Sequence, residues 1–157
     1  MKCMLLIGMP GSGKSWWTRN FLKSNPDYVV ISSDDIIDEK CAEEGITYSE
    51  GFLKFIGFAT AEMNRRIKNS VDNGFNIIWD QTNMNVKTRK SKISQLPGYT
   101  VEAVVFSVSD PVLKQRLDER ARTTGKSIPE NVLKSMAQSY VPPSKAEGFE
   151  KITFVRG

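Results

Sequence analysis

Apolar residues gather in five short, nearly continuous runs spread along the whole chain. These runs are Cys3–Ile7, Tyr28–Ser32, Phe75–Trp79, Thr100–Val108 and Lys151–Val155. Runs of this kind, rich in Ile, Val and aromatic residues and bounded by Gly, Pro, Asn or Asp, are typical of buried β-strands. We therefore expect five strands.

The segments between these runs carry apolar residues at helical spacing. The clearest is Ser49–Asp72, where Thr47 and Glu50 form a candidate capping box and Gly74 stops the helix. Helices are also predicted over Trp16–Lys23, over Val86–Gln95, from Asp110 and Pro111 to about Ala121, and from Pro129 onward, and another ends near Cys41. Strands that alternate with crossover helices predict an α/β protein with a doubly wound, five-stranded parallel sheet and helices on both faces.

No linker, repeat or low-complexity tract divides the chain, so we expect a single domain over residues 1–157. A hydrophobic content of 39% is enough to build one core in a chain of this length. The chain has no histidine, which excludes histidine bases, Ser-His-Asp triads and histidine-ligated zinc. Any proton acceptor is therefore a carboxylate or a less usual group. Cys3 and Cys41 are expected to be buried thiols rather than a disulfide or a metal site.

No apolar run approaches the ~20 residues of a membrane span, and no signal-type pattern begins the chain. We therefore expect a cytoplasmic protein without membrane contact. The net charge of +4 and the pI near 9.1 suit a polyanionic partner, but they are also common among proteins that have none.

The segment GMPGSGKS lies between the first predicted strand and the first predicted helix. Its spacing of glycine, four residues, glycine, lysine and serine is typical of a phosphate-binding loop. In such a loop the backbone N–H groups cradle phosphates at a helix N-terminus, the lysine reaches the terminal phosphates and the hydroxyl holds magnesium. The predicted nucleotide-binding residues of the loop are Gly8, Pro10, Gly11, Ser12, Gly13, Lys14 and Ser15.

Acidic residues follow the second and third predicted strands, at the edge where ligands bind to this class of sheet. Asp34 follows the strand nearest the loop, so it is our candidate for the general base that accepts the proton of an incoming hydroxyl. Asp35 could instead cap the following helix. Asp80 is the candidate that completes the magnesium shell through water, alongside Ser15.

Three arginines lie in or next to the polar, glycine-containing break Arg122–Ser127. Such a break can form a mobile lid, which we expect at about residues 120–128. Arg116, Arg120 and Arg122 could stabilise the charge that spreads over a transferred phosphoryl group. Arg122 is the strongest of these candidates because it is nearest the break, and Arg120 is expected to bind the nucleotide with it.

A phosphate loop alone does not choose among kinases, GTPases, motors and regulatory switches. The guanine-reading Asn-Lys-x-Asp segment of GTPases is absent, and the chain is shorter than the usual motor ATPase modules. Together with the lid arginines, this favours a small phosphotransferase that uses ATP and Mg²⁺.

At these residues the sequence resembles the kinase domain of the bacteriophage 5′-polynucleotide kinase family, within the small P-loop kinases that include zeta toxins and gluconate kinases. The resemblance spans nearly the whole chain. It is carried by GMPGSGKS with the following Trp16-Trp-Thr-Arg19, by Ser33-Asp34-Asp35, by Asp80-Gln-Thr-Asn-Met-Asn85, and by the Pro-x-x-Val-Leu-x-Ser-Met pattern within Ile128–Met136.

This resemblance implies a P-loop kinase fold that transfers the γ-phosphate of ATP, with magnesium, to the 5′-hydroxyl of a DNA or RNA end. Asp34 matches the general base of the family. Lys14 and Ser15 match its phosphate and magnesium ligands, and Arg122 matches its lid arginine.

The resemblance also bears on the acceptor. Thr82 and Asn83 fall where family members approach the acceptor strand. One departure matters, because the family places an arginine three residues after its general base. Here that position is Ile37, and Lys40 is the nearest cation, so acceptor binding can differ.

Other interpretations stay open at this point. One is a kinase of a small hydroxylated molecule, such as a sugar or a nucleotide-sugar. Another is a module that binds ATP without transferring its phosphate. Trp16 or Trp17 could stack a base of a single strand, although tryptophans early in a helix more often belong to the core.

Overall fold

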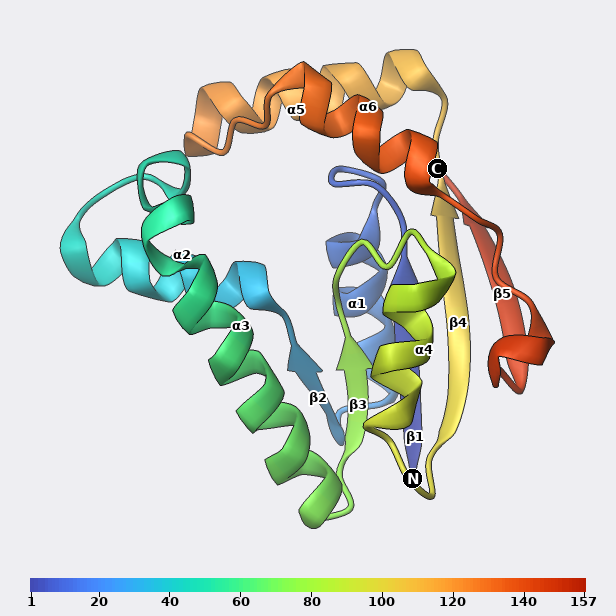
Figure 1. The fold of residues 1–157 in the computed structure, drawn as a ribbon. Coiled ribbons are helices and arrows are strands. Elements are labelled where there is room, and N and C mark those ends of the chain that lie inside the picture. Colours follow the sequence, from blue (N-terminus) through green and yellow to red (C-terminus); the bar gives the residue numbers. More distant parts are fainter.

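A five-stranded parallel sheet forms the centre of the protein, as a computed structural model that describes residues 1–157 shows (Figure 1). The strands are β1 (Lys2–Ile7), β2 (Tyr28–Ile31), β3 (Asn76–Trp79), β4 (Thr100–Ser107) and β5 (Lys151–Arg156). They lie in the order β2-β3-β1-β4-β5, and every neighbouring pair is parallel. The order reverses on either side of β1, which confirms the doubly wound sheet expected from the sequence.

Six helices and one 3₁₀ turn connect or follow these strands. They are α1 (Lys14–Ser24), α2 (Ser33–Glu44), α3 (Tyr48–Asp72), α4 (Val86–Ser94), α5 (Asp110–Thr124), α6 (Glu130–Ser139) and the 3₁₀ turn η1 (Lys145–Glu147). The capping box expected at the start of α3 is present, since the Thr47 side chain accepts from the Glu50 N–H and the Glu50 side chain accepts from Thr47. No helix is long and apolar enough to cross a membrane.

The core has two layers, because successive residues of β1 point to opposite faces of the sheet. Leu5 and Ile7 join the larger cluster, in which α2 and α3 contribute residues such as Ile37 and Met63. Leu6 joins the smaller cluster, which α1 covers through aromatic and aliphatic side chains. Helices therefore pack on both faces of the sheet. Cys3 and Cys41 are free and buried in the larger cluster, as expected.

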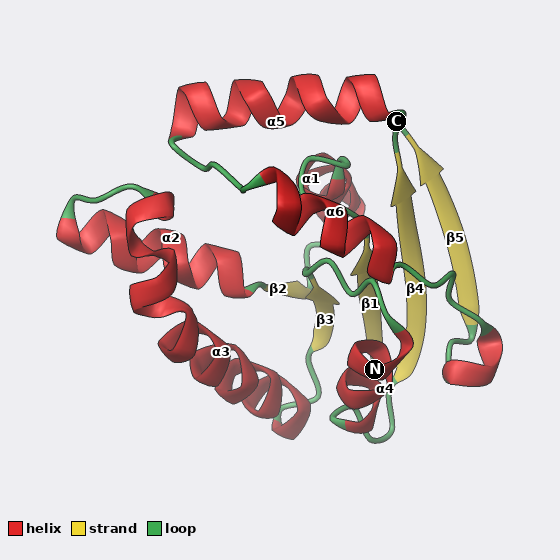
Figure 2. Ribbon diagram, turned by 45° about the horizontal axis from the view of Figure 1, so that its top comes forward, coloured by secondary structure: helices red, strands yellow, loops and turns green.

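Helices α5 and α6 stand over the carboxyl edge of the sheet instead of packing on its faces (Figures 1 and 2). The link between them is docked on the start of α3. The Ser49 hydroxyl donates to the Gly125 carbonyl at 2.6 Å and accepts from the Ser127 N–H at 2.9 Å. This arrangement places α5 and the link along one side of the space above the phosphate loop.

Several predicted boundaries were wrong by a few residues. Helix α5 continues to Thr124 and ends at Gly125, which adopts a positive φ of 72°. Arg122 therefore lies in the last turn of α5 and not in the break. The break starts at Gly125, because no earlier residue stops the helix.

A second correction concerns the start of α2. Asp34 and Asp35 lie in the first turn of this helix instead of at the end of a strand. The cap is Ser32, whose hydroxyl accepts from the Asp35 N–H at 3.4 Å, so Asp35 does not cap the helix. Carboxylates in a first turn are stabilised by the helix dipole.

Candidate active site

The loop between β1 and α1 has the backbone geometry that a phosphate site needs. Gly11 and Gly13 adopt φ values of 80° and 106°, where other residues are strained. A Cβ at Gly8 would lie 2.6 Å from the Ser12 hydroxyl oxygen and 3.0 Å from the Phe106 Cβ, so a side chain there would displace its neighbours. No side chain caps α1, and its first N–H groups are left for a ligand. The Ser12 hydroxyl is buried without a hydrogen-bond partner and faces the same loop.

Lys14 closes over this loop from the first turn of α1. Its Nζ donates to the carbonyl oxygens of Gly8 at 2.7 Å and Met9 at 3.1 Å. Burial lowers the pKa of Lys14 to about 8, although the carboxylates of Asp80 and Asp34 favour its charged form. An ammonium that burial destabilises gains most from an anionic ligand.

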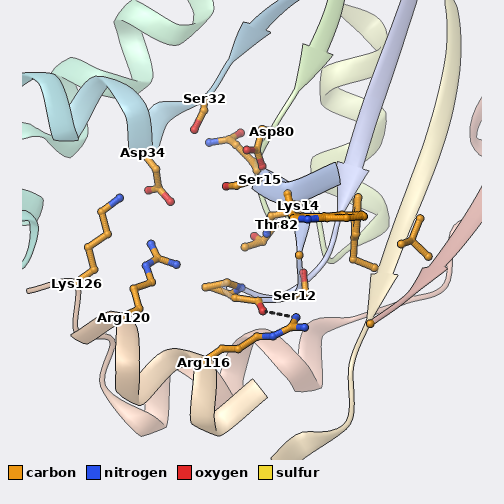
Figure 3. Close-up of a pocket in the computed structure, with 18 of the residues that line it drawn as sticks. Ser12, Lys14, Ser15, Ser32, Asp34, Asp80, Thr82, Arg116, Arg120 and Lys126 are labelled. Carbon is orange, nitrogen blue, oxygen red and sulfur yellow. Dashed lines mark hydrogen bonds between the residues drawn. The ribbon is translucent and has the colours of Figure 1, made fainter. Parts of the chain in front are cut away.

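A cavity of about 810 Å³ opens above the loop at the carboxyl edge of the sheet (Figure 3). Asp34, Asp80 and Thr82 line it on the side of β2 and β3. The side chains of Arg120 and Lys126 extend toward Asp34 from the side of α5. A cavity of this size fits a nucleotide.

Asp80 follows β3, and its N–H donates to the Ile31 carbonyl at 2.9 Å, which ties the two strand ends together. Burial raises the pKa of Asp80 to about 6 against the opposing effect of Lys14. Ser15 lines the same cavity. The hydroxyl of Ser15 and the carboxylate of Asp80 are the hard oxygen donors that Mg²⁺ prefers, and Mg²⁺ usually takes its remaining ligands from water and substrate phosphates. These two residues therefore fit a magnesium ion held together with a nucleotide.

Asp34 is held by an aromatic residue that sequence reasoning missed. The Tyr48 hydroxyl, at the start of α3, donates to Asp34 Oδ1 at 2.6 Å. Burial and this hydrogen bond raise the pKa of Tyr48, so the phenol stays protonated as a donor. Lys126 Nζ lies 4.8 Å from the centre of the Tyr48 ring and 2.6 Å from Asp38 Oδ2. The first turn of α3 thus connects the candidate base to the link between α5 and α6.

A second cavity of about 750 Å³ adjoins the first. Its lining includes seven hydrophobic residues, and Lys92 is its only cation. Besides Tyr48, these hydrophobic residues are Phe52, Leu53, Ile56, Ile128, Val132 and Met136. Five residues line both cavities, and they are Pro10, Asp34, Asp80, Gln81 and Thr82. The candidate base therefore stands where a phosphate-loop cavity meets a mainly apolar one.

Thr82 and Asn83, which the resemblance assigns to the acceptor, differ in exposure. Thr82 lines both cavities, and its carbonyl accepts from the Gly8 N–H at 3.0 Å. Asn83 is only 2% exposed and adopts a positive φ of 50°. Its amide donates to the Leu6 carbonyl at 2.7 Å, and its side-chain oxygen accepts from Lys92. Asn83 thus shapes the loop that presents Thr82, and it also lines the second cavity.

Arg89 reinforces the same loop from α4 and was also missed. It is fully buried, and one of its Nη atoms donates to the carbonyl oxygens of Asn83 and Met84, each at 3.0 Å. Its Nε donates to Glu147 Oε1 at 2.8 Å. The two partners are 58 residues apart, and no spacing rule joins them. The only local signal is an arginine among the apolar positions of a short helix.

The three candidate arginines are not equivalent in the structure. Arg116 and Arg120 line the first cavity, and one Nη of Arg116 donates to the Gly11 carbonyl at 3.2 Å (Figure 3). Arg122 is exposed on α5 and does not line either cavity. The structure therefore brings together the loop, Asp34, Asp80, Thr82 and Arg120, but not Arg122.

A parallel sheet flanked by helices, with a phosphate loop after its first strand, is the architecture of a P-loop kinase fold. The sequence profile of the AAA_33 family, described as an AAA domain, matches residues 4–143. The chain therefore belongs to this family.

Among curated proteins, the chain is 23% identical over 156 residues to human "Heterogeneous nuclear ribonucleoprotein U-like protein 2", which covers 96% of the chain and 21% of that protein. It is 25% identical over 161 residues to "Putative bifunctional polynucleotide phosphatase/kinase" of Acanthamoeba polyphaga mimivirus, which covers 97% of the chain and 32% of that protein. The chain thus spans about a fifth to a third of the length of these relatives.

Solved structures give the same fold. A chain of the Pnkp1/Rnl/Hen1 RNA repair complex superposes with a TM-score of 0.70 at 25% identity, covering 88% of this chain and 43% of that one. A gluconokinase from Sinorhizobium meliloti superposes with a TM-score of 0.59 at 17% identity, covering 99% of this chain and 82% of that one. A gluconokinase and a chain of an RNA repair complex therefore share this fold, so the fold alone does not identify an acceptor.

Proposed function

We propose that this protein is an ATP-dependent polynucleotide 5′-hydroxyl kinase, with Asp34 as the general base. One observation carries the proposal: Asp34 lines both the phosphate-loop cavity and the neighbouring cavity. A phosphotransferase needs a proton acceptor at the point where nucleotide and acceptor meet. Asp34 has that position, and the absence of histidine leaves a carboxylate as the natural base.

The other residues of the site have roles that follow from their chemistry. The N–H groups of the loop and Lys14 hold the phosphates of ATP. Ser15 and Asp80 would hold a magnesium ion, which neutralises phosphate charge when bound. Asp34 accepts the proton of the attacking hydroxyl, and Arg120 stabilises the charge on the transferred group. Arg122 would join Arg120 if the end of α5 turned toward the cavity.

The relatives support a nucleic-acid end as the acceptor. The name of the mimivirus relative includes a polynucleotide kinase, and a solved neighbour belongs to an RNA repair complex. Thr82 lines both cavities and supports an acceptor hydroxyl placed beside Asp34. The apolar wall with Phe52 suits the face of a nucleobase.

The test is transfer of label from γ-labelled ATP to a 5′-hydroxyl oligonucleotide in the presence of magnesium. Asp34→Asn should lower the rate by about 100-fold or more, because a positioned general base contributes this much. The matched control is Asp72→Asn, which changes an exposed carboxylate paired with Lys68 on α3 and should leave the rate unchanged. A wild-type protein that labels no oligonucleotide, DNA or RNA, contradicts the proposal.

A second candidate is a kinase of a small, uncharged hydroxyl compound such as a sugar. It is favoured by the lining of the second cavity, which has no arginine and whose only cation, Lys92, is bonded to Asn83. Ile37, where the resemblance expects an arginine, is fully buried. Label transfer to a sugar and not to an oligonucleotide would identify this function. Binding of ATP by the wild type without label transfer to an oligonucleotide or a sugar would instead indicate a module that only binds ATP.

A further inference from the structure

Two neighbouring tryptophans at the start of α1 have opposite surroundings. Trp17 is half-buried, stacks on Phe21 at 4.8 Å between ring centres and meets Phe106 edge-on at 5.9 Å. Trp16 is 64% exposed and stacks on no other aromatic ring. The indole of Trp16 is therefore accessible to a ligand, whereas that of Trp17 is packed against other rings.

Trp16 comes directly after Ser15 and lines the phosphate-loop cavity. This cavity has two chemically different ends. Asp34 and Asp80 line the end above β2 and β3, whereas Phe106 and Val155 line the end above β4 and β5, where they are partners in register. Figure 1 shows these two pairs of strands on opposite sides of β1, which leads into the loop.

This division sets the direction of a bound nucleotide. The loop above β1 holds the phosphates, and the γ-phosphate faces the acids if Asp34 is the base. The ribose and the base must then extend toward the other end of the cavity. The contact between Trp17 and Phe106 brings the start of α1 near the end of β4, and Trp16 lines the cavity together with Phe106 and Val155. The nucleobase therefore meets the three hydrophobic residues of the cavity, which are Trp16, Phe106 and Val155.

We propose that the exposed indole of Trp16 stacks on the nucleobase of the bound nucleoside triphosphate. The inference rests on the proposed function, because it takes the direction of the nucleotide from the role of Asp34. Stacking uses the π-face that every base has, so Trp16 contributes affinity and not a choice between ATP and GTP.

The first experiment compares two ligands that share a phosphate chain and differ in the base. Calorimetry measures the binding of magnesium ATP and of inorganic tripolyphosphate to the wild type, Trp16→Ala and Trp16→Phe. Loss of one stacking partner should weaken ATP binding about 10-fold in Trp16→Ala and leave tripolyphosphate binding unchanged. Trp16→Phe should bind ATP nearly as well as the wild type. Unchanged ATP binding in Trp16→Ala, or equal weakening of both ligands, overturns the inference.

The second experiment follows tryptophan fluorescence during an ATP titration. Trp79 is fully buried and Trp17 is packed, so an ATP-dependent change should come from Trp16. Trp16→Phe should lose this change, and the control Trp17→Phe should keep it. The opposite pattern overturns the inference. Failure of the wild type to bind ATP would contradict the proposed function itself, whereas normal ATP binding without these effects contradicts only the role of Trp16.

Discussion

The two cavities that meet at Asp34 are built in different ways. The phosphate-loop cavity depends on one stretch of backbone, residues 8–15, whose N–H groups and glycine φ values are local properties. The second cavity is assembled from the start of α3, the loop after β3, and the link between α5 and α6. Side chains from distant segments make its wall. The phosphate loop is therefore encoded locally, whereas the proposed acceptor cavity depends on tertiary packing.

The largest effect on activity should come from a change in the phosphate-loop cavity. Lys14→Ala removes a buried ammonium that is expected to bind the phosphates of ATP. Turnover should therefore fall about 100- to 1,000-fold. Steady-state phosphorylation of an oligonucleotide measures this. Lys23→Ala, at the other end of α1, is the matched control because Lys23 bonds only to Asn20, on the surface. Equal rates in the Lys14 variant and the wild type would remove the phosphate loop from the mechanism.

The hydrogen bond from Tyr48 to Asp34, where the two cavities meet, should have a smaller effect on activity. Tyr48→Phe removes the hydrogen bond to Asp34 and should lower kcat about 10-fold, with the KM for ATP unchanged, because the base is less well oriented. Tyr99→Phe serves as the control, since the Tyr99 hydroxyl bonds to the Ser70 and Phe75 carbonyls. If both variants lose activity equally, the role of Tyr48 is only structural.

A substitution in the second cavity should change only the binding of the acceptor. Phe52→Ala removes aromatic surface from the second cavity and should raise the KM for the acceptor about fivefold, with the KM for ATP unchanged. Phe75→Ala is the matched control, because Phe75 is similarly exposed but lines neither cavity. An increase in the KM for ATP instead would place Phe52 on the nucleotide side.

The smallest effect concerns the stability of the nucleotide-free protein. The pKa of Asp80 is raised from 3.8 to about 6, so the folded state binds more protons than the unfolded state between these values. The free energy of unfolding should therefore fall as the pH rises through this window. Asp80→Asn should remove this fall and stabilise the protein at pH 7 by roughly 0.5–1 kcal/mol, a value reduced for partial exposure. Urea unfolding at about pH 4.5 and pH 7 measures it; an unchanged pH dependence in the variant would contradict it.

The features that could be predicted from the sequence are those that depend on residues close together along the chain. The phosphate loop, the order of strands and helices and the capping box of Thr47 and Glu50 depend on residues a few positions apart, and all were predicted correctly. Asp34 and Asp35 were placed at the end of a strand, but they lie in the first turn of α2, because Ser32 caps this helix directly after β2.

The residues that were missed act over long stretches of chain. Tyr48 lies 14 residues from Asp34, and Lys126 lies 88 residues from Asp38. Neither pair has a spacing that marks it, because only tertiary packing brings the partners together. The lid arginine was chosen by its distance from a break, and the break moved by three residues when α5 continued to Gly125. Arg122 therefore stays a prediction, while Arg120 lines the cavity.

The buried ion pair between Arg89 and Glu147 has a practical consequence for expressing this protein. The family profile ends at residue 143, so a fragment trimmed to the matched region would keep Arg89 and lose its carboxylate partner. An arginine left charged and unpaired in the interior is strongly destabilising. The loop that carries Thr82 would lose its support, although every residue of the phosphate loop remained. A fragment designed from the family boundary would therefore keep the phosphate loop but lose the support of the loop beside Asp34 that lines both cavities.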